Sequence, residues 1–332
     1  MRELTERENM LLMLEGRQPE WIPNFSAAAM NIEPACLARK LNPATGYLVD
    51  FCSVDFTSTI DGYTPAHTND GNFAFKDITK WKEYMPKVDL DRVDWEQDAR
   101  SALFNARSLY GEMSEGEKVI NYTTSKLWEE MHYGFGFEEA LCALAEEPEA
   151  CYDFLQAMAD YQIKAFHKFC KYCKPDLGML FDHMATATGM MMSPKTYREI
   201  IKPAQKKVCD ALIEEGVMPE IHVDGDISAI LPDLAEIGIK AIQPFQIFND
   251  IEGAKERYGM NCIGGWDSFG PGNQPDADEA AARQSVRDAM DQYGPTNRYA
   301  IFLSGVTKRN PDRMFWLNDE ANRYGRAFYH NR

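Results

Sequence analysis

The amino-acid sequence predicts one α/β domain in which eight parallel strands, with helices between them, close into a (β/α)8 TIM barrel. Strand-like and helix-like segments alternate from Trp21 to the end of the chain. Most of the strand-like segments are almost continuously apolar, which is typical of a parallel sheet whose outer face is covered by helices. The length of 332 residues suits one barrel, and no repeat or linker divides the chain, so a single domain is expected over residues 1–332. A doubly wound sheet is the alternative arrangement.

The eight strand candidates are short and rich in β-branched and aromatic residues. They lie at residues 21–27, 49–58, 118–125, 177–185, 218–225, 240–246, 261–268 and 298–305. A charged amphipathic N-terminal helix precedes the first of them. Residues 63–100 have weak periodicity, and we expect them to form an insertion of loops and short helices after the second strand.

The helices between the strands carry their usual boundary residues. Ser193 and Pro194 supply an N-cap and a proline at the first helical position, and Gly216 ends the helix that they open. Gly238 ends a second helical segment, as a glycine after the last helical residue commonly does. A third segment begins with acidic residues, which the helix dipole favours, and ends at Gly294.

The net charge of the chain disfavours polyanionic partners. Asp and Glu number 52 and Lys and Arg 35, a formal net charge of −17 that would repel nucleic acid and anionic membranes. No run of about 18 apolar residues could cross a membrane, and the N-terminal segment is a charged helix rather than an apolar signal. The eight cysteines show no disulfide-scaffold spacing, so we expect reduced thiols in a soluble, cytoplasmic protein.

In barrels of this kind the reacting groups lie at the carboxyl ends of the strands. Here these ends finish on polar residues, and we predict that several of them surround a substrate. The candidates for substrate binding are Asn24, Asn121, Tyr122, His183, Gln243, Trp266 and Asp267. Aromatic residues are frequent near the same rim, which suits a flat or apolar ligand better than a sugar phosphate.

The segment MPEIHVDGD (218–226) places Glu220, His222 and Asp224 on one face of a strand, because side chains two apart point the same way. Ionisable groups on an apolar strand are costly unless they are paired, bind a metal or take part in chemistry. His222 and Asp224 could bind zinc or another divalent metal, or form a base oriented by a carboxylate, or be a solvated pair at the barrel mouth. Glu220 would lie one layer deeper.

Asp182 and His183 end the preceding strand, so alternation points only one of them into the barrel. We predict that Asp182 faces inward if Leu180 does, and that His183 reaches the site from the loop. The predicted catalytic residues are therefore His222, Asp224 and Asp182, and the predicted metal ligands are His222 and Asp224. We expect these groups and Trp266 to open into one cavity.

Four segments resemble the uroporphyrinogen decarboxylase superfamily. They are GFEEALCALAEEPEACYDFL (136–155), MMSPKTYREIIKPAQKKVCDALIEEG (191–216), ISAILPDLAEIGIKAIQPFQ (227–246) and DIEGAKERYGMNCIGGWD (250–267). The resemblance extends over nearly the whole chain, and it too implies a (β/α)8 barrel. Within the superfamily the chain is more similar to the corrinoid-dependent methyltransferases than to the decarboxylases.

Two departures from the family pattern refine what the resemblance implies. The decarboxylases carry an N-terminal arginine motif that binds substrate carboxylates, whereas the corresponding residues 21–34, WIPNFSAAAMNIEP, contain no arginine. Decarboxylation of a porphyrinogen is therefore not expected. Relatives that methylate thiols bind zinc through His-x-Cys and a late cysteine, whereas this chain has His222-Val223-Asp224 and no cysteine in FLSGVTKRNPD (302–312).

A carboxylate in place of thiolate ligands makes a harder, more Lewis-acidic site, which suits an ether or phenolic oxygen better than a thiol. The resemblance thus implies the O-demethylating methyltransferases, which move a methyl group from a methyl ether, often a methoxylated aromatic, to the cobalt of a corrinoid. A separate corrinoid protein would carry that cofactor. The alternatives are a decarboxylase or other lyase acting on a small acid, and a non-catalytic corrinoid- or ligand-binding barrel.

Overall fold

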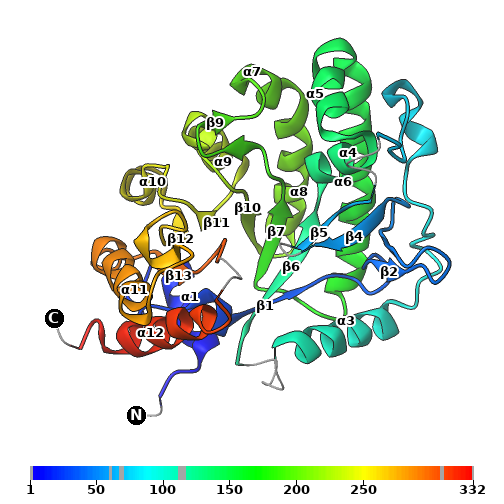
Figure 1. The fold of residues 1–332 in the computed structure, drawn as a ribbon. Coiled ribbons are helices and arrows are strands. Elements are labelled where there is room, and N and C mark those ends of the chain that lie inside the picture. Colours follow the sequence, from blue (N-terminus) through cyan, green and yellow to red (C-terminus); the bar gives the residue numbers. More distant parts are fainter. Residues whose placement is uncertain (1–2, 60–61, 67–70, 111–116, 307–309, 331–332) are drawn as a thin grey trace.

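The computed structural model describes residues 3–59, 62–66, 71–110, 117–306 and 310–330 of the chain. At its centre is a curled sheet of seven parallel strands in the order β1-β6-β7-β10-β11-β12-β13 (Figure 1). These strands are β1 (Ala29–Ile32), β6 (Val119–Ser125), β7 (Leu177–Phe181), β10 (Met218–His222), β11 (Ala241–Phe245), β12 (Asn261–Gly265) and β13 (Tyr299–Phe302). The parallel α/β arrangement that the sequence predicts is confirmed.

The two edges of this sheet approach each other through the segment that precedes β1. Ile301 of β13 donates its backbone N–H to the carbonyl oxygen of Pro23 at 2.9 Å, and Asn24 forms a parallel bridge with Ile301. A short helix, α2 (Phe25–Ala28), then separates this bridge from β1. The predicted first strand, residues 21–27, is therefore a bridge followed by helix, and the strand itself comes later.

The predicted second barrel strand, residues 49–58, is wrong. A tight turn divides this stretch, because Asp50 accepts the backbone N–H groups of Cys52 and Val54, both at 2.9 Å, and Ser53 has a φ of 68°. The two halves belong to a separate antiparallel sheet, which consists of β2 (Lys40–Leu41), β3 (Leu48–Val49), β4 (Asp55–Thr59) and β5 (Gly62–Pro65).

Helices lie around the outer side of the parallel sheet (Figure 1). The region predicted to be an insertion contains the 3-10 helix η1 (Ile78–Glu83), and α3 (Trp95–Tyr110) leads from it towards β6. The other helices are α1 (Glu6–Leu14), α4 (Leu127–Phe135), α5 (Phe137–Glu146), α6 (Pro148–Cys170), α7 (Pro194–Thr196), the π-helical turn η2 (Tyr197–Ile201), α8 (Lys202–Glu214), η3 (Ser228–Ile230), α9 (Leu231–Ile237), α10 (Ile251–Tyr258), η4 (Pro271–Asn273), α11 (Glu279–Tyr293) and α12 (Arg313–Ala327).

The predicted helix boundaries are confirmed. The Ser193 hydroxyl accepts the backbone N–H of Thr196 at 3.0 Å, as an N-cap does. Gly238 follows α9 in the left-handed conformation with a φ of 101°, and Gly294 follows α11. Within the described part of the chain, no helix combines the length and the apolar character that a bilayer span requires.

Helix α1 packs against the amino ends of the strands. The apolar cluster that it forms with them is buried and includes Met10, Met13, Leu14, Phe25, Val119, Leu177, Ala241, Ile263 and Ala300. Val119, Leu177 and Ala241 are the first residues of β6, β7 and β11. Helix α1 therefore closes this end of the sheet, and the opposite, carboxyl ends are left for a site.

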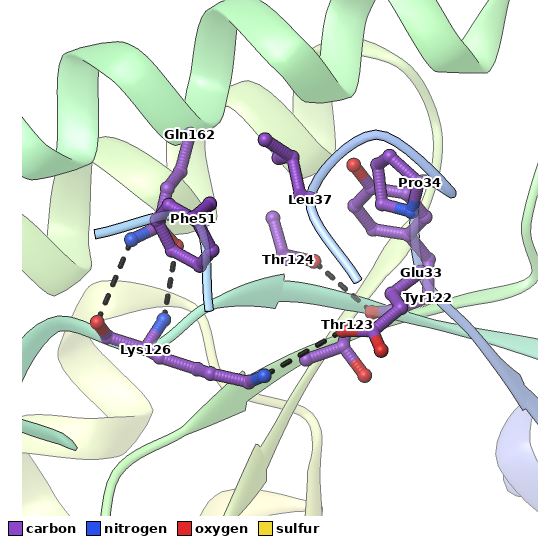
Figure 2. Close-up of a pocket in the computed structure, with 9 residues that line it drawn as sticks. All are labelled: Glu33, Pro34, Leu37, Phe51, Tyr122, Thr123, Thr124, Lys126 and Gln162. Atoms are coloured by element: carbon purple, nitrogen blue, oxygen red, sulfur yellow. Dashed lines mark hydrogen bonds and ion pairs between the residues drawn. The ribbon is translucent and has the colours of Figure 1, made fainter. Parts of the chain in front are cut away.

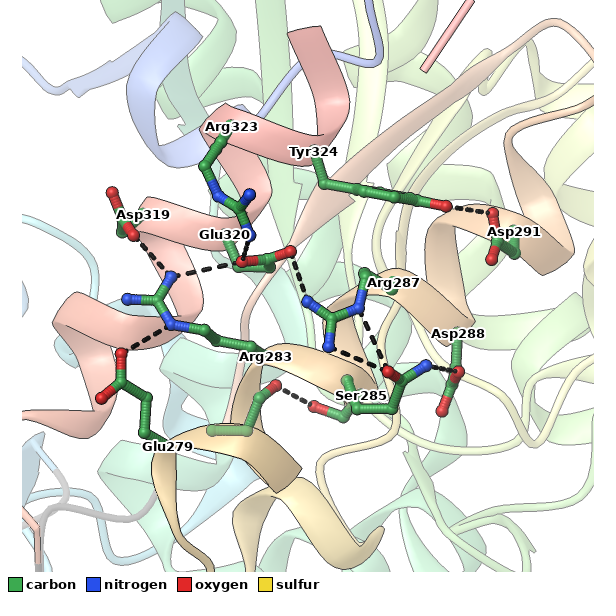
Figure 3. Close-up of polar contacts among 12 residues, drawn as sticks. Glu279, Arg283, Ser285, Arg287, Asp288, Asp291, Asp319, Glu320, Arg323 and Tyr324 are labelled. Carbon is green, nitrogen blue, oxygen red and sulfur yellow. Dashed lines mark hydrogen bonds and ion pairs between the residues drawn. The ribbon is translucent and has the colours of Figure 1, made fainter. Parts of the chain in front are cut away.

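A cluster of charged residues joins α11 to α12 (Figure 3). The side chain of Glu320 is fully buried, and its carboxylate accepts hydrogen bonds from Arg283 at 3.2 Å and from Arg287 and Arg323 at 2.6 Å. Burial alone would raise the pKa of Glu320, but the three guanidinium groups hold this pKa below its ordinary value. The cluster fixes α12, whose residue Met314 reaches the cavity described below.

Candidate functional site

The candidate site lies where β7 and β10 end and α4 begins. Asp182, which follows β7, accepts the backbone N–H groups of Leu127 at 2.9 Å and of Trp128 at 2.8 Å, so its carboxylate caps α4. In return, the carboxylate of Glu129 in the first turn of α4 accepts the backbone N–H of His183 at 2.9 Å. Each segment thus accepts hydrogen bonds from the other, and together these bonds hold the end of β7 against the start of α4.

His183 lies between two carboxylates. Its Nδ1 atom is 2.6 Å from Oε1 of Glu129, and its Nε2 atom is 3.0 Å from Oδ2 of Asp224. Burial alone would lower the pKa of His183, but the hydrogen bonds to Asp224 and Glu129 raise it to about 10. The imidazole is therefore a cation at neutral pH, unless a metal cation takes the place of its Nε2 proton.

Both of these carboxylates remain ionised. Burial alone would raise the pKa of Asp224, but the hydrogen bond from His183 lowers it. Burial would also raise the pKa of Glu129, which is 1% exposed, but hydrogen bonds from His132 and His183 hold it well below its ordinary value. His132 contacts the second oxygen of Glu129, with Nε2 and Oε2 3.1 Å apart.

His222, the last residue of β10, lies beside His183. Its Nδ1 atom is 2.9 Å from Oε1 of Gln243, and an amide oxygen only accepts, so Nδ1 carries the proton. The His222 ring stacks on Phe181 with centroids 4.6 Å apart and meets the His183 ring edge-on at 5.1 Å. Burial and the positive charge of His183 lower the pKa of His222 to about 4. His222 is therefore neutral, and the lone pair of Nε2 is available for a ligand.

His183, His222 and Asp224 fit a divalent cation. Each offers one ligand atom, and these atoms all lie within 4.8 Å of one another. Two imidazole nitrogens and a carboxylate oxygen form a donor set that zinc and similar divalent ions bind. The Nδ1 atom of each histidine is hydrogen-bonded to an acceptor, Glu129 or Gln243, which is the usual arrangement behind metal-binding histidines.

A cavity of about 770 Å³ opens beside His222 and Asp224. This volume lies within the range of about 300–1,000 Å³ found for small-molecule sites. Its other lining residues are Ser26, Pro244, Phe302, Leu303, Ser304, Gly305, Val306 and Met314. These described wall residues are mostly apolar, which suits a ligand with an apolar body.

The prediction that Asp182 and Trp266 open into this cavity is wrong. Asp182 is 0% exposed, and its second oxygen accepts a hydrogen bond from Gln205 at 2.9 Å, so both of its oxygens serve the fold. The Trp266 indole N–H points towards α11 and donates to Ser285 at 3.0 Å. Asp267 lines a separate hollow beside α11.

Three other predicted substrate contacts lie outside the cavity. Asn24 donates hydrogen bonds to two asparagine side chains of α12, at 3.1 and 3.0 Å. Tyr122 is buried against two phenylalanine rings of α6. Asn121 is fully buried in the same sheet as Glu220, whose pKa burial raises to about 8. Each of these three side chains is buried inside the fold, away from the cavity.

A second cavity, in whose wall Tyr122 does lie, is far smaller (Figure 2). Its volume is about 20 Å³, enough for one water molecule. Gln162 on one side accepts the backbone N–H of Lys126 at 2.9 Å, and Lys126 forms an ion pair with Glu33 at 3.5 Å. No substrate of the predicted size fits this space.

Four predicted residues do meet at the site: His183, His222, Asp224 and Gln243. Glu129 was not predicted, although its surroundings carry a usable pattern. In KLWEEMHYGFGF (126–137) an acidic pair stands among apolar and aromatic residues, and a buried acid needs a partner.

The comparisons with known proteins identify the family and the fold of the chain. The sequence profile of the family described as uroporphyrinogen decarboxylase (URO-D) matches residues 128–304, more than half of the chain. The chain belongs to the uroporphyrinogen decarboxylase family. This confirms the family that the sequence predicts, and the matched residues include His183, His222 and Asp224. No protein among the curated sequences matches the chain.

Among solved structures, a methyltransferase from Methanosarcina mazei has the same fold as this URO-D family member. The two share 12% sequence identity with a TM-score of 0.61, over 97% of this chain and 99% of that chain. A Xaa-Pro dipeptidase with bound methionine has 13% identity and a TM-score of 0.35, over 68% of this chain and 57% of that chain, which is too distant to bear on the fold.

Proposed function

We propose that this member of the URO-D family is a methyltransferase that moves a methyl group from a methyl ether to the cobalt of a corrinoid on a partner protein. The observation that carries the proposal is the sulfur-free group of His183, His222 and Asp224 beside a mostly apolar cavity. The fold shared with the Methanosarcina mazei methyltransferase supports methyl transfer as the class of reaction.

A methoxylated aromatic suits this cavity in one orientation. The apolar side chains of Phe302, Leu303 and Met314 would contact the ring, and the ether oxygen would face His222 and Asp224. As the methyl carbon bonds to the acceptor, the carbon–oxygen bond breaks and its electron pair stays on the oxygen. The chain therefore acts by holding the ether in place and by stabilising the leaving oxygen.

The groups that face the leaving oxygen fit two versions of this chemistry. When bound by His183, His222 and Asp224, a divalent cation would supply Lewis acidity towards that oxygen. In the metal-free protein, the imidazolium of His183, whose Nε2 pairs with Asp224 at 3.0 Å, would instead supply a proton to that oxygen. Gln243 and the stacked ring of Phe181 keep His222 oriented in both versions.

The same cavity disfavours the alternative substrates. Activation of a thiol would be served by thiolate zinc ligands, and the described residues around the cavity include no cysteine. Decarboxylation of a small acid would need a free cation against the carboxylate, whereas the cation of His183 is already paired with Glu129 and Asp224.

Consumption of cob(I)alamin, followed by absorbance, tests the proposal with a panel of methyl ethers, thiols and small carboxylic acids. We expect consumption with methoxylated aromatics, and none when the protein is left out. Reaction of an ether without any corrinoid, or release of carbon dioxide from an acid, would overturn the proposal. Binding of an ether or a corrinoid with no turnover of any panel member would identify a non-catalytic barrel instead.

A further inference from the structure

Glu129 is a buried carboxylate that touches the site only through another residue. Its Oε1 atom accepts both the backbone N–H of His183 at 2.9 Å and the Nδ1 atom of that ring at 2.6 Å. Its Oε2 atom is held by His132 at 3.1 Å. Both oxygens of Glu129 are therefore engaged, and neither is left for a substrate in the cavity.

The position of His183 depends on this contact. His183 is the second residue after the end of β7, so no strand pairing fixes its side chain. Because Glu129 binds the backbone N–H and Nδ1 together, the peptide and the ring of His183 are held in one arrangement. In that arrangement Nε2 faces Asp224, with Nε2 and Oδ2 3.0 Å apart.

His222 is oriented in a similar way, but by a weaker hydrogen bond. Gln243, which lies opposite His222 in the β10–β11 register, holds its Nδ1 through a neutral amide oxygen at 2.9 Å. A hydrogen bond to a carboxylate is stronger than one to an amide. It also makes the opposite ring nitrogen more basic and therefore a better metal ligand. His183, which no strand holds, therefore makes the stronger Nδ1 hydrogen bond of the two histidines.

We infer that Glu129 is a positioning residue that makes His183 the third protein ligand of a divalent cation, beside His222 and Asp224. This inference rests on one part of the proposed function, the version in which a divalent cation is bound at the site. It predicts a nitrogen, nitrogen and oxygen donor set of the kind that holds zinc with open positions for a substrate oxygen.

Zinc affinity of the full-length protein tests the inference, measured by competition with a chromophoric chelator. Glu129→Gln keeps the shape of the side chain and removes its charge, and we expect zinc to bind about 10- to 100-fold more weakly, the usual scale for such an outer residue. Glu130→Gln is the matched control, because Glu130 is the next residue, is equally buried at 1% exposure and lies beside Asp50 rather than the site. We expect the control to bind zinc as the wild type does.

The inference can also be tested on the wild-type protein, so that the test does not depend on the folding of a variant. In ¹⁵N spectra of the histidine rings with zinc bound, we expect His183 to carry its proton on Nδ1. Equal zinc affinity in Glu129→Gln and wild type, or a His183 ring protonated on Nε2, would overturn the positioning role. A wild-type protein that binds no zinc would overturn the cation itself, whereas methyl transfer by the metal-free version is judged separately by consumption of cob(I)alamin.

Discussion

Glu129 and Asp182 bind each other's chain segment in opposite directions. Asp182 accepts the backbone N–H of Glu129 at 3.3 Å, and Glu129 accepts the backbone N–H of His183, the residue after Asp182, at 2.9 Å. One carboxylate thus holds the start of α4, and the other holds the loop that carries a site histidine. The two acids lie side by side, but they should respond to substitution in different ways.

Asp182→Ala should lower the stability of the protein rather than remove a reacting group. It leaves buried backbone N–H groups of α4 and the Gln205 amide without an acceptor. A loss of about 3 kcal/mol in the free energy of unfolding is expected from such unsatisfied groups. Urea denaturation measures this loss, and Asp182→Asn should lose less because its amide oxygen still accepts. An Asp182→Ala protein as stable as the wild type but inactive would restore the catalytic role that the sequence suggested.

Glu320→Gln should destabilise the protein in a manner that depends on pH. The folded pKa of Glu320 lies below its ordinary value, so the stabilisation from its ionised form is complete above the unfolded pKa of about 4.3. It is lost as the pH falls through the lowered folded pKa. At pH 7 we expect a loss of about 2 kcal/mol, the scale of a hydrogen bond to a charged group.

Urea denaturation at pH 7, 5 and 3 would follow the difference between Glu320→Gln and the wild type. The difference should shrink below the unfolded pKa of about 4.3, because the unfolded wild type then binds a proton at Glu320 more readily than the folded protein does. Glu279→Gln is the control, because Glu279 is half exposed and pairs with Arg283 at 2.7 Å. A constant difference at all three pH values would contradict the assignment of the effect to the charge of Glu320.

Gly264→Ala should disrupt the pairing of β11 with β12. A Cβ atom at Gly264 would lie 2.6 Å from the backbone nitrogen of Phe245 and 2.7 Å from its carbonyl oxygen. Backbone atoms of a paired strand cannot move aside, so a loss of about 3 kcal/mol or a failure to fold is expected. Gly46→Ala is the control: Gly46 also has a positive φ, 74°, which is unfavourable for alanine, but a Cβ atom there would meet nothing within 4 Å. Similar thermal unfolding of both variants would argue against the close approach as the cause.

The sequence predicts the positions of His222 and Gln243 well because both residues lie on regular strands. His222 and Gln243 are neighbours in the β10–β11 register, and the two-residue period of a strand suffices to place His222 at its end. The period fails where a strand stops. Because β7 ends before Asp182, alternation assigned the inward place to Asp182, whereas His183 occupies it.

Other errors have long-range causes that a local pattern does not contain. Residues 49–58 are rich in β-branched and aromatic residues, as barrel strands are, but composition does not distinguish a parallel from an antiparallel partner. Trp266 follows Gly265, whose φ of 73° turns the chain out of the strand and aims the indole at α11. Glu129 reaches His183 from a helix 54 residues earlier, a distance over which no periodicity connects them.

Asp224→Asn should slow methyl transfer far more than it weakens substrate binding. Asp224 lies in the cavity wall with its carboxylate 3.0 Å from Nε2 of His183. Asp224 acts on the leaving oxygen indirectly, by holding a bound cation or the imidazolium of His183, and that group is needed most as negative charge develops on the oxygen. The amide keeps the size of the side chain and loses the charge. A fall in turnover of about 100-fold or more is the scale of one such electrostatic group.

Consumption of cob(I)alamin at varied concentrations of a methoxylated aromatic separates the two effects, since kcat should fall and KM should change little. Asp226→Asn is the control: Asp226 lies two residues further along, and its carboxylate accepts the backbone N–H of Ser228 at 3.0 Å. We expect that control to turn over as the wild type does. A variant Asp224→Asn with an unchanged kcat and a raised KM would show that Asp224 binds the substrate without stabilising the leaving oxygen, and the proposed mechanism would then be wrong.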